Sequence, residues 1–290
     1  MERVFFILLL LLPIKGYSES FPITLLKGYI LTEATIEGES VLVILDSGAP
    51  GLVLNEKYYD ADPASAIPCS GINGSFEANT HQVKQWSWLG VSNKKTNALV
   101  SDLSFIERSL NRKVHALIGL EVLKDYYVTI NYDFKTIAIE KELDEKMDDN
   151  FSKFQYIGHL PVMACKVNGV KKILGLDTGS AGNYFFEYDQ TSDENLVASA
   201  LPILVIGTDN TEDIKYQLPM QLEVPDCDID LTSTFIVDLR DAGYFQQAGF
   251  DGLLGQDFLQ QYNVVIHPGK QKICLMKRAE QMSFVSSLMP

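Results

Sequence analysis

The chain carries an internal repeat, which constrains its fold more than any other feature of its 290 residues. Each half contains a run of apolar residues that ends in an Asp, a small hydroxyl residue and a Gly. The two strings are Asp46-Ser47-Gly48 and Asp177-Thr178-Gly179, 131 positions apart. The same shift also superimposes the apolar runs that precede them, at 41–45 and 172–176. A repeat of this length indicates two similar structural units within one chain.

A second block repeats further along, at a shift of 136 positions. Leu117-Ile118-Gly119 aligns with Leu253-Leu254-Gly255, and the residues after each Gly match as well. The change of shift by five positions indicates a loop insertion in the second copy. One short string of small residues recurs by accident, whereas two matching blocks in the same order indicate a true duplication.

The combination of the two blocks resembles the lobe of an aspartic protease, and in particular of the retropepsin-like proteases. The resemblance spans about Leu31 to Met276 in two copies. It implies an all-β fold of two retropepsin-like β-barrel lobes, related by a pseudo-twofold axis, with the active site in the cleft between them. We place the N-terminal lobe at 19–141, a charged linker at 142–155 and the C-terminal lobe at 156–290.

Local patterns agree with an all-β assignment. Short runs rich in Val, Ile, Tyr and Thr alternate with turn signals, and Asn168-Gly169 between two apolar runs is a strong hairpin signal. Glu37-Gly38-Glu39 marks the matching turn in the first copy. We expect a short helix after each apolar-apolar-Gly string, at 121–125 and 257–261.

The first residues have the layout of a cleaved secretory signal. Arg3 precedes an apolar stretch from Val4 to Leu12, and a small, polar segment from Gly16 to Ser20 follows, in which we place the cleavage after Ser18. The stretch is too short to span a bilayer, which needs about 20 apolar residues. We therefore expect residues 1–18 to be removed, no membrane span, and export of the chain to a periplasmic or extracellular location.

Charge and cysteine content narrow the possible partners. The formal net charge of −14 disfavours binding to nucleic acid, whose phosphates are also negative. The four cysteines lack the C-x-x-C spacing of metal sites, so no metal and no cofactor are predicted. Cys165 and Cys274 fall in predicted strands, and we expect both to be buried as small apolar residues.

The two repeated Asp residues indicate the chemistry of the predicted active site. A pseudo-twofold arrangement brings Asp46 and Asp177 together, and two carboxyls that close cannot both ionise, so they share one proton. Such a pair can deprotonate a water for attack on a peptide carbonyl and then protonate the departing nitrogen. The simpler alternative is that each Asp only caps its own turn. Capping alone gives no reason for both copies of the repeat to place Asp at the same point.

The resemblance assigns supporting roles to the rest of each string. Ser47 and Thr178 would bond across the two loops, with Gly48 and Gly179 allowing their close approach. A further hypothesis is that Ser180, which has Ala49 as its counterpart, donates a hydrogen bond to Asp177 and so makes Asp177 the more anionic partner. The family also covers its cleft with β-hairpin flaps, for which the candidates are Gly71, Gly74 and Gly207.

The sequence thus predicts a secreted, monomeric aspartic endopeptidase that acts on polypeptides. Two alternatives stay open. The cleft could hold an extended peptide as an added strand without cutting it, or each lobe could pair with its twin in a second chain, so that the active unit is a homodimer.

Overall fold

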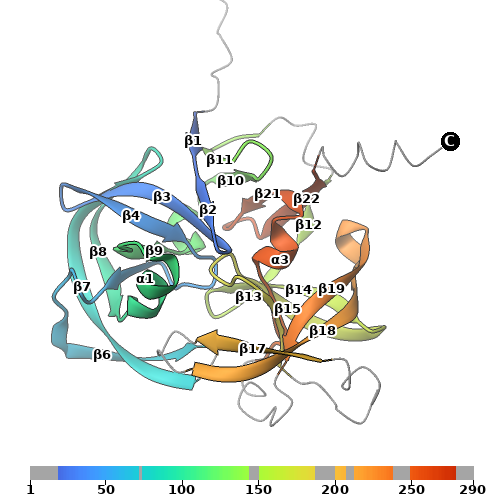
Figure 1. Cartoon of the computed structure of the whole chain (residues 1–290). Coiled ribbons are helices and arrows are strands. Elements are labelled where there is room, and N and C mark those ends of the chain that lie inside the picture. Colours follow the sequence, from blue (N-terminus) through green and yellow to red (C-terminus); the bar gives the residue numbers. More distant parts are fainter. Residues whose placement is uncertain are drawn as a thin grey trace, which may run out of the picture.

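The computed structural model describes residues 19–71, 74–143, 150–186, 200–206, 212–237 and 249–278. The predicted signal peptide at 1–18, the flap candidate Gly207 and residues 144–149 of the predicted linker lie outside these ranges. The described residues are mostly in strands, arranged as two similar sheet-rich lobes (Figure 1).

The first lobe is built on an eight-stranded sheet. Its strand order is β2-β3-β4-β9-β5-β8-β7-β6. The bounds are β2 Thr24–Leu26, β3 Tyr29–Ile36, β4 Glu39–Leu45, β5 Leu52–Asn55, β6 Asp62–Gly71, β7 Gly74–Trp88, β8 Val91–Ser101 and β9 Ala116–Ile118. The lobe also contains helix α1 (Ser104–Leu110) and the 3-10 helix η1 (Leu120–Leu123).

The second lobe repeats this plan. Its strand order is β13-β14-β15-β20-β16-β19-β18-β17. The bounds are β13 Gln155–Ile157, β14 Leu160–Val167, β15 Val170–Leu176, β16 Asn183–Phe185, β17 Leu201–Ile206, β18 Glu212–Val224, β19 Ile229–Val237 and β20 Gly252–Leu254. The 3-10 helix η3 (Pro225–Cys227) and helix α3 (Gln256–Leu259) complete it. Helices η1 and α3 confirm the short helices expected after each apolar-apolar-Gly string.

The two hairpins that carry the Asp strings turn as the sequence predicts. Glu37 and Gly38 join β3 to β4 with φ of +52° and +93°, and Asn168 and Gly169 join β14 to β15 with φ of +48° and +78°. Two consecutive left-handed residues make the tight turn that matches the twist of an antiparallel pair. Asn and Gly adopt this conformation at little cost, which is why the sequence signal was clear.

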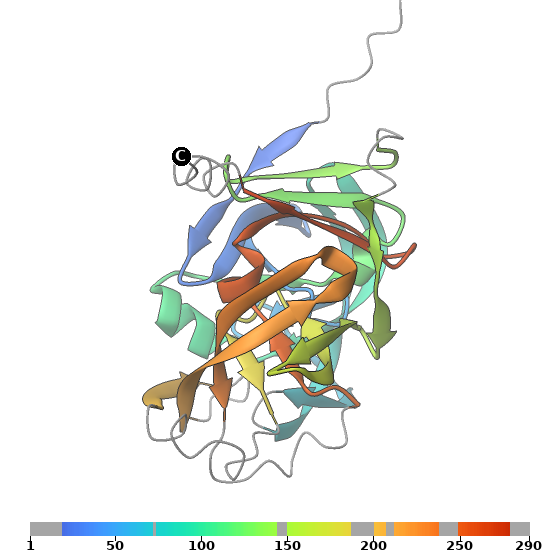
Figure 2. The ribbon, with the colours of Figure 1, turned by 90° about the vertical axis from the view of Figure 1, so that its right-hand side faces the viewer.

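A third, six-stranded sheet contains strands from both halves of the chain. Its order is β1-β11-β10-β21-β22-β12, with β1 Ser20–Pro22, β10 Tyr127–Asn131, β11 Thr136–Glu140, β12 Ser152–Lys153, β21 Tyr262–His267 and β22 Lys272–Lys277. Strand β12 lies in the region predicted as linker and pairs with β22. Figure 2 shows this sheet at one end of the molecule, above both lobes.

The register of this sheet locates the pseudo-twofold axis. Thr129 of β10 pairs with Val265 of β21, and these two residues are equivalents in the repeat, 136 positions apart. Antiparallel pairing of a strand with its own duplicate, centred on equivalent residues, requires a twofold axis between them. The duplication seen in the sequence is therefore also a structural symmetry.

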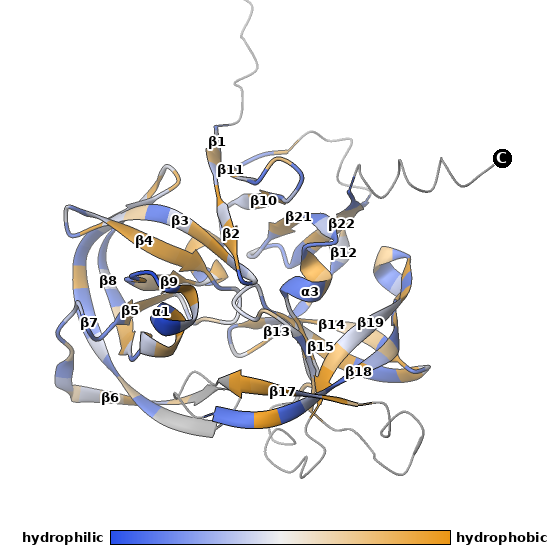
Figure 3. Cartoon of the chain, in the orientation of Figure 1, coloured by the Kyte–Doolittle hydropathy of each residue, from blue (hydrophilic) through white to orange (hydrophobic). Residues whose placement is uncertain are grey.

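One continuous apolar core runs through both lobes and under the six-stranded sheet. It includes Leu45 and Ile118 from the first lobe and Leu176 and Leu254 from the second. Hydropathy follows this arrangement, since β4 is largely hydrophobic while much of β7 is hydrophilic (Figure 3). No helix in the described ranges has the length and apolar character that crossing a membrane would need.

Candidate active site

Each Asp string follows a buried strand and is fixed by a neighbouring parallel strand. Strand β4 runs parallel to β9, and the amide of Asp46 donates to the carbonyl of Ile118 at 2.9 Å. Strand β15 runs parallel to β20, and the amide of Asp177 donates to the carbonyl of Leu254 at 3.0 Å. The first and second blocks of the repeat therefore meet at this point in both lobes.

Each carboxylate also organises the turn that follows it. The amide of Gly48 donates to Oδ1 of Asp46 at 2.8 Å, and the amide of Gly179 donates to Oδ1 of Asp177 at 2.9 Å. Both Asp residues thus cap their own turns, which is the simpler role considered above. Capping uses Oδ1 of each Asp. It does not account for the position of Oδ2 or for the contact between the two turns.

The two turns face one another closely enough to bring the carboxyls into contact. The side chains of Asp46 and Asp177 hydrogen-bond to each other. A Cβ atom on Gly48 would lie 2.8 Å from Oδ1 of Asp177, and one on Gly179 would lie 2.5 Å from Oδ2 of Asp46. Both glycines are required because each covers the opposite carboxyl with backbone alone.

The hydroxyl residues lock the two turns together. The amide of Ser47 donates to Oγ1 of Thr178 at 2.9 Å, and the amide of Thr178 donates to Oγ of Ser47 at 2.8 Å. The Ser47 hydroxyl then donates to the carbonyl of Leu176 at 2.7 Å, and the Thr178 hydroxyl donates to that of Leu45 at 3.0 Å. All four bonds cross between the lobes, and both side chains are buried. The structure therefore contains the cross-bonding that the resemblance implies.

A polar layer that the sequence reasoning missed supports the second turn. The Gln256 amide group donates to the carbonyl of Thr178 at 3.0 Å and accepts from the hydroxyl of Tyr132 at 2.9 Å. Both side chains are almost fully buried. The first lobe has Leu120 at the position equivalent to Gln256, so the two turns are supported differently. A polar residue directly after Leu254-Gly255 was the available signal.

The glycines of the second block permit another close approach. A Cβ on Gly119 would overlap the carbonyl oxygen of Ala49, and one on Gly255 would lie 2.6 Å from the carbonyl oxygen of Ser180. These contacts press the apolar-apolar-Gly strand against the catalytic turn of the same lobe. The second block of the repeat is therefore part of the site and not only part of the core.

The environment of the pair raises the pKa of both carboxyls. Burial raises the pKa of Asp46 well above its ordinary value, and the nearby charge of Asp177 raises it further. Burial also raises the pKa of Asp177, against hydrogen bonds from Gly179 and Asp46 and the charge of His159, which oppose the rise. The two carboxyls titrate as a pair, and the raised pKa values favour one shared proton between them.

The Ser180 hydroxyl does not make the hydrogen bond proposed for it. The Ser180 hydroxyl donates to the carbonyl of Gly182 at 2.9 Å, within its own turn, and not to Asp177. The hypothesis that Ser180 polarises the pair is wrong, because the backbone carbonyl two residues on is the acceptor that the turn presents to this hydroxyl.

A tyrosine beside the pair also escaped the sequence reasoning. Burial raises the pKa of the Tyr29 phenol to about 12, with further contributions from the charges of Asp46 and Asp177. Tyr29 follows the turn between β2 and β3, whose Gly28 packs against the second catalytic turn: a Cβ on Gly28 would lie 2.7 Å from Cβ of Ala181. The first lobe thus contributes a phenol to the surroundings of Asp177.

The flap candidates lie in, or next to, paired strands. Gly71 pairs with Gly74 at the end of the β6–β7 hairpin, and Ile206 pairs with Glu212 at the end of the β17–β18 hairpin that flanks Gly207. Both hairpins lie at the end of the molecule opposite the six-stranded sheet (Figures 1 and 2). That either hairpin covers the dyad stays a prediction.

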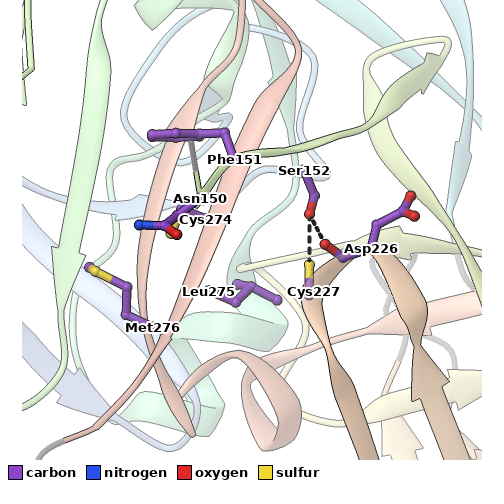
Figure 4. Close-up of a pocket in the computed structure, with 8 residues that line it drawn as sticks. All are labelled: Asn150, Phe151, Ser152, Asp226, Cys227, Cys274, Leu275 and Met276. Atoms are coloured by element: carbon purple, nitrogen blue, oxygen red, sulfur yellow. Dashed lines mark hydrogen bonds between the residues drawn. The ribbon is translucent and has the colours of Figure 1, made fainter. Parts of the chain in front are cut away.

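A separate hollow of about 380 Å³ lies away from the dyad, beside β12 and η3. Figure 4 shows Ser152 and Cys227 on one side of it and Met276 on the other. The Cys227 thiol donates to the Ser152 hydroxyl at 3.5 Å. All four cysteines are free thiols, and Cys165 and Cys274 are buried as expected. Within the described ranges, no group of three or more His, Cys, Asp and Glu side chains is placed to hold a metal ion.

Comparison with known proteins supports the fold. No protein-family model matches the sequence, and no curated protein sequence matches it. Among solved structures, the chain is similar to the crystal structure of an aspartic proteinase from Irpex lacteus, with a TM-score of 0.57 and 11% sequence identity over 91% of this chain and 98% of that one. The chain therefore has the bilobal, all-β fold of pepsin-like aspartic proteinases, as the resemblance of its two repeat blocks implied.

Proposed function

We propose that the chain is an aspartic endopeptidase, in which Asp46 and Asp177 activate a water molecule to hydrolyse a peptide bond. The observation that carries the proposal is the contact between the two carboxyls, both of whose pKa values are raised. An acid pair that shares one proton holds a base and an acid side by side, which is what amide hydrolysis needs.

We assign the role of base to Asp177 and the role of acid to Asp46. The Asp177 carboxylate takes a proton from water as the water oxygen attacks the peptide carbonyl carbon, while the Asp46 carboxyl donates a hydrogen bond to the carbonyl oxygen. The tetrahedral intermediate then collapses as the proton moves from Asp177 to the departing nitrogen, and the pair returns to its singly protonated state. The four bonds made by Ser47 and Thr178 hold the turns still during this exchange.

Two further statements about the enzyme rest on the sequence. The Arg3 and Val4–Leu12 layout supports export and removal of residues 1–18. The presence of both Asp strings in one chain supports a monomer as the active unit, with a polypeptide as its substrate. No metal or cofactor takes part in the proposed reaction.

The proposal is tested by incubating the chain that starts at Glu19 with a peptide library between pH 3 and pH 7 and identifying the products by mass spectrometry. We expect internal cleavage that a hydroxyl-containing peptide analogue of the tetrahedral intermediate inhibits. Binding of that analogue without any cleavage would support the non-catalytic peptide-binding alternative instead.

A further inference from the structure

Two exposed carboxylates flank the acid pair at equivalent places in the two lobes. Glu121 lies in η1 and Asp257 lies in α3, each two residues after the Gly of the second repeat block. Their positions differ by 136, the shift of that block, so they are equivalents under the pseudo-twofold axis. Most residues are not acidic in both copies, whereas here an acid occupies the same point twice.

Each of these carboxylates lies against the catalytic turn of its own lobe. A Cβ on Gly51 would lie 3.7 Å from Oε2 of Glu121, and a Cβ on Gly182 would lie 3.7 Å from Oδ2 of Asp257. Gly51 and Gly182 are themselves equivalent and follow Asp46 and Asp177 by five residues. Five residues span at most about 17 Å of extended chain, so each carboxylate lies within a few substrate residues of the dyad.

A tyrosine lies in the surroundings of Asp257. The Tyr184 side chain is only 9% exposed, and the structure shows no hydrogen bond from its hydroxyl to any described residue. Burial raises the pKa of this phenol most, and the charges of Tyr29, Asp177 and Asp257 raise it further, which places the phenol near both carboxylates. A tyrosine hydroxyl can accept a hydrogen bond from a donor group of a bound substrate.

Neither flanking carboxylate is neutralised within the described part of the chain. No ion pair there involves Glu121 or Asp257, and burial alone raises the pKa of Asp257, with no opposing cation. A partly desolvated carboxylate gains from an ammonium or guanidinium group placed beside it. An extended peptide in the cleft could supply such a group on each side of the scissile bond.

We propose that Glu121 and Asp257 select substrates that carry a lysine or arginine side chain on each side of the scissile bond. The inference rests on the proposed peptidase function and names its substrate class. The pseudo-twofold symmetry places one acidic subsite on each side of the dyad, and the Tyr184 hydroxyl adds a hydrogen-bond acceptor to the Asp257 subsite only.

The test compares cleavage of peptides that are randomised one position at a time, over five residues on each side of the scissile bond. The variants are Glu121→Gln and Asp257→Asn. Glu39→Gln and Asp228→Asn are the matched controls, because they remove the same charge from exposed positions, and Glu39 begins β4 at the end remote from Asp46. The controls lower the overall negative charge by the same amount as the two variants and so separate local from overall attraction.

For the unmodified chain we expect lysine to be preferred over norleucine at one position on each side. Each variant should lower the lysine-to-norleucine ratio of kcat/KM by roughly three- to tenfold, on one side only and on opposite sides for the two variants. The controls should leave both ratios unchanged. Cleavage without a basic preference, or a loss that the controls share, would overturn the inference.

Binding separates this inference from the proposed function. The same lysine and norleucine peptides, with the scissile amide reduced to an amine-linked methylene so that they cannot be cleaved, are titrated by calorimetry. A lysine preference in binding by a chain that cleaves no peptide would retain the selectivity inference and contradict the peptidase proposal. No difference in binding would contradict the selectivity inference, whatever the activity.

Discussion

Ser47 and Thr178 exchange hydrogen bonds across the boundary between the lobes, and each hydroxyl is both acceptor and donor. The two residues are repeat equivalents, so the pseudo-twofold axis passes between them as it does between Thr129 and Val265. The axis therefore runs through the catalytic turns and through the six-stranded sheet. This arrangement holds the carboxyls of the two catalytic turns opposite one another.

Ser47→Ala should destabilise the protein and reduce its activity. The change leaves the Thr178 amide without an acceptor and the Leu176 carbonyl without the hydroxyl donor, both in a buried position. Two such losses cost roughly 2–4 kcal/mol. Urea denaturation measures the free energy of unfolding, and Thr178→Ser, which keeps its hydroxyl, is the control expected to change it little. Equal stability of Ser47→Ala and the unmodified chain would show that the crossed bonds do not hold the lobes.

Gly48→Ala should abolish peptidase activity without unfolding the chain. The added methyl group would lie 2.8 Å from Oδ1 of Asp177, so the carboxyls must move apart. Gly169→Ala is a control, because space around that glycine is open and only its φ of +78° opposes the change, at a cost of about 1 kcal/mol. Activity assays and circular dichroism on both variants make the comparison. Normal turnover by Gly48→Ala would contradict the close approach of the two turns.

Asp46→Asn should stabilise the protein at neutral pH. Because burial and Asp177 raise the pKa of Asp46 in the folded state, the native chain loses stability as the pH rises from the unfolded value of about 3.9 through the folded pKa. Asn carries no ionisable group and avoids this loss. The melting temperature of the variant should exceed that of the unmodified chain at pH 7, and the difference should shrink toward pH 4. A constant difference across this range would exclude the raised pKa as its source.

Ser180→Ala should leave the pH–rate profile unchanged. The Ser180 hydroxyl donates to Gly182 within its own turn and does not reach Asp177, so its removal changes neither apparent pKa of the pair. The profile is measured as kcat/KM between pH 3 and pH 7. A shift of either limb of the pH–rate profile would show that Ser180 bonds to Asp177 in the working enzyme.

The repeat predicted most of this structure, because a duplicated lobe constrains both copies at once. The hairpins around Gly38 and Gly169, the short helices after Gly119 and Gly255, and the crossed bonds of Ser47 and Thr178 all follow from local patterns or from the resemblance. The pairing of β10 with β21, and of β12 with β22, could not be read from the sequence. Strand partners from different lobes are chosen by tertiary packing, which leaves no periodic signal in either strand.

The hydrogen-bond partners of individual side chains were harder to predict than the fold of the backbone. Ser180 was expected to donate to Asp177, but the backbone carbonyl of Gly182 accepts its hydrogen bond. Gln256 was overlooked because the equivalent position in the first lobe is Leu120, and a comparison of the two copies does not emphasise residues in which they differ. Differences between the copies also surround the acid pair, since the charge of His159 opposes the rise in the pKa of Asp177.

The most direct test of the shared acid pair is the activity of Asp46→Asn, Asp177→Asn and the double variant on one peptide substrate, with circular dichroism to confirm that each is folded. Because the two carboxyls act as a unit, each single change should lower kcat/KM by at least about 10⁴-fold, and the double change should cost little more than either. Near-normal turnover in one single variant, or losses that multiply in the double variant, would contradict the central claim.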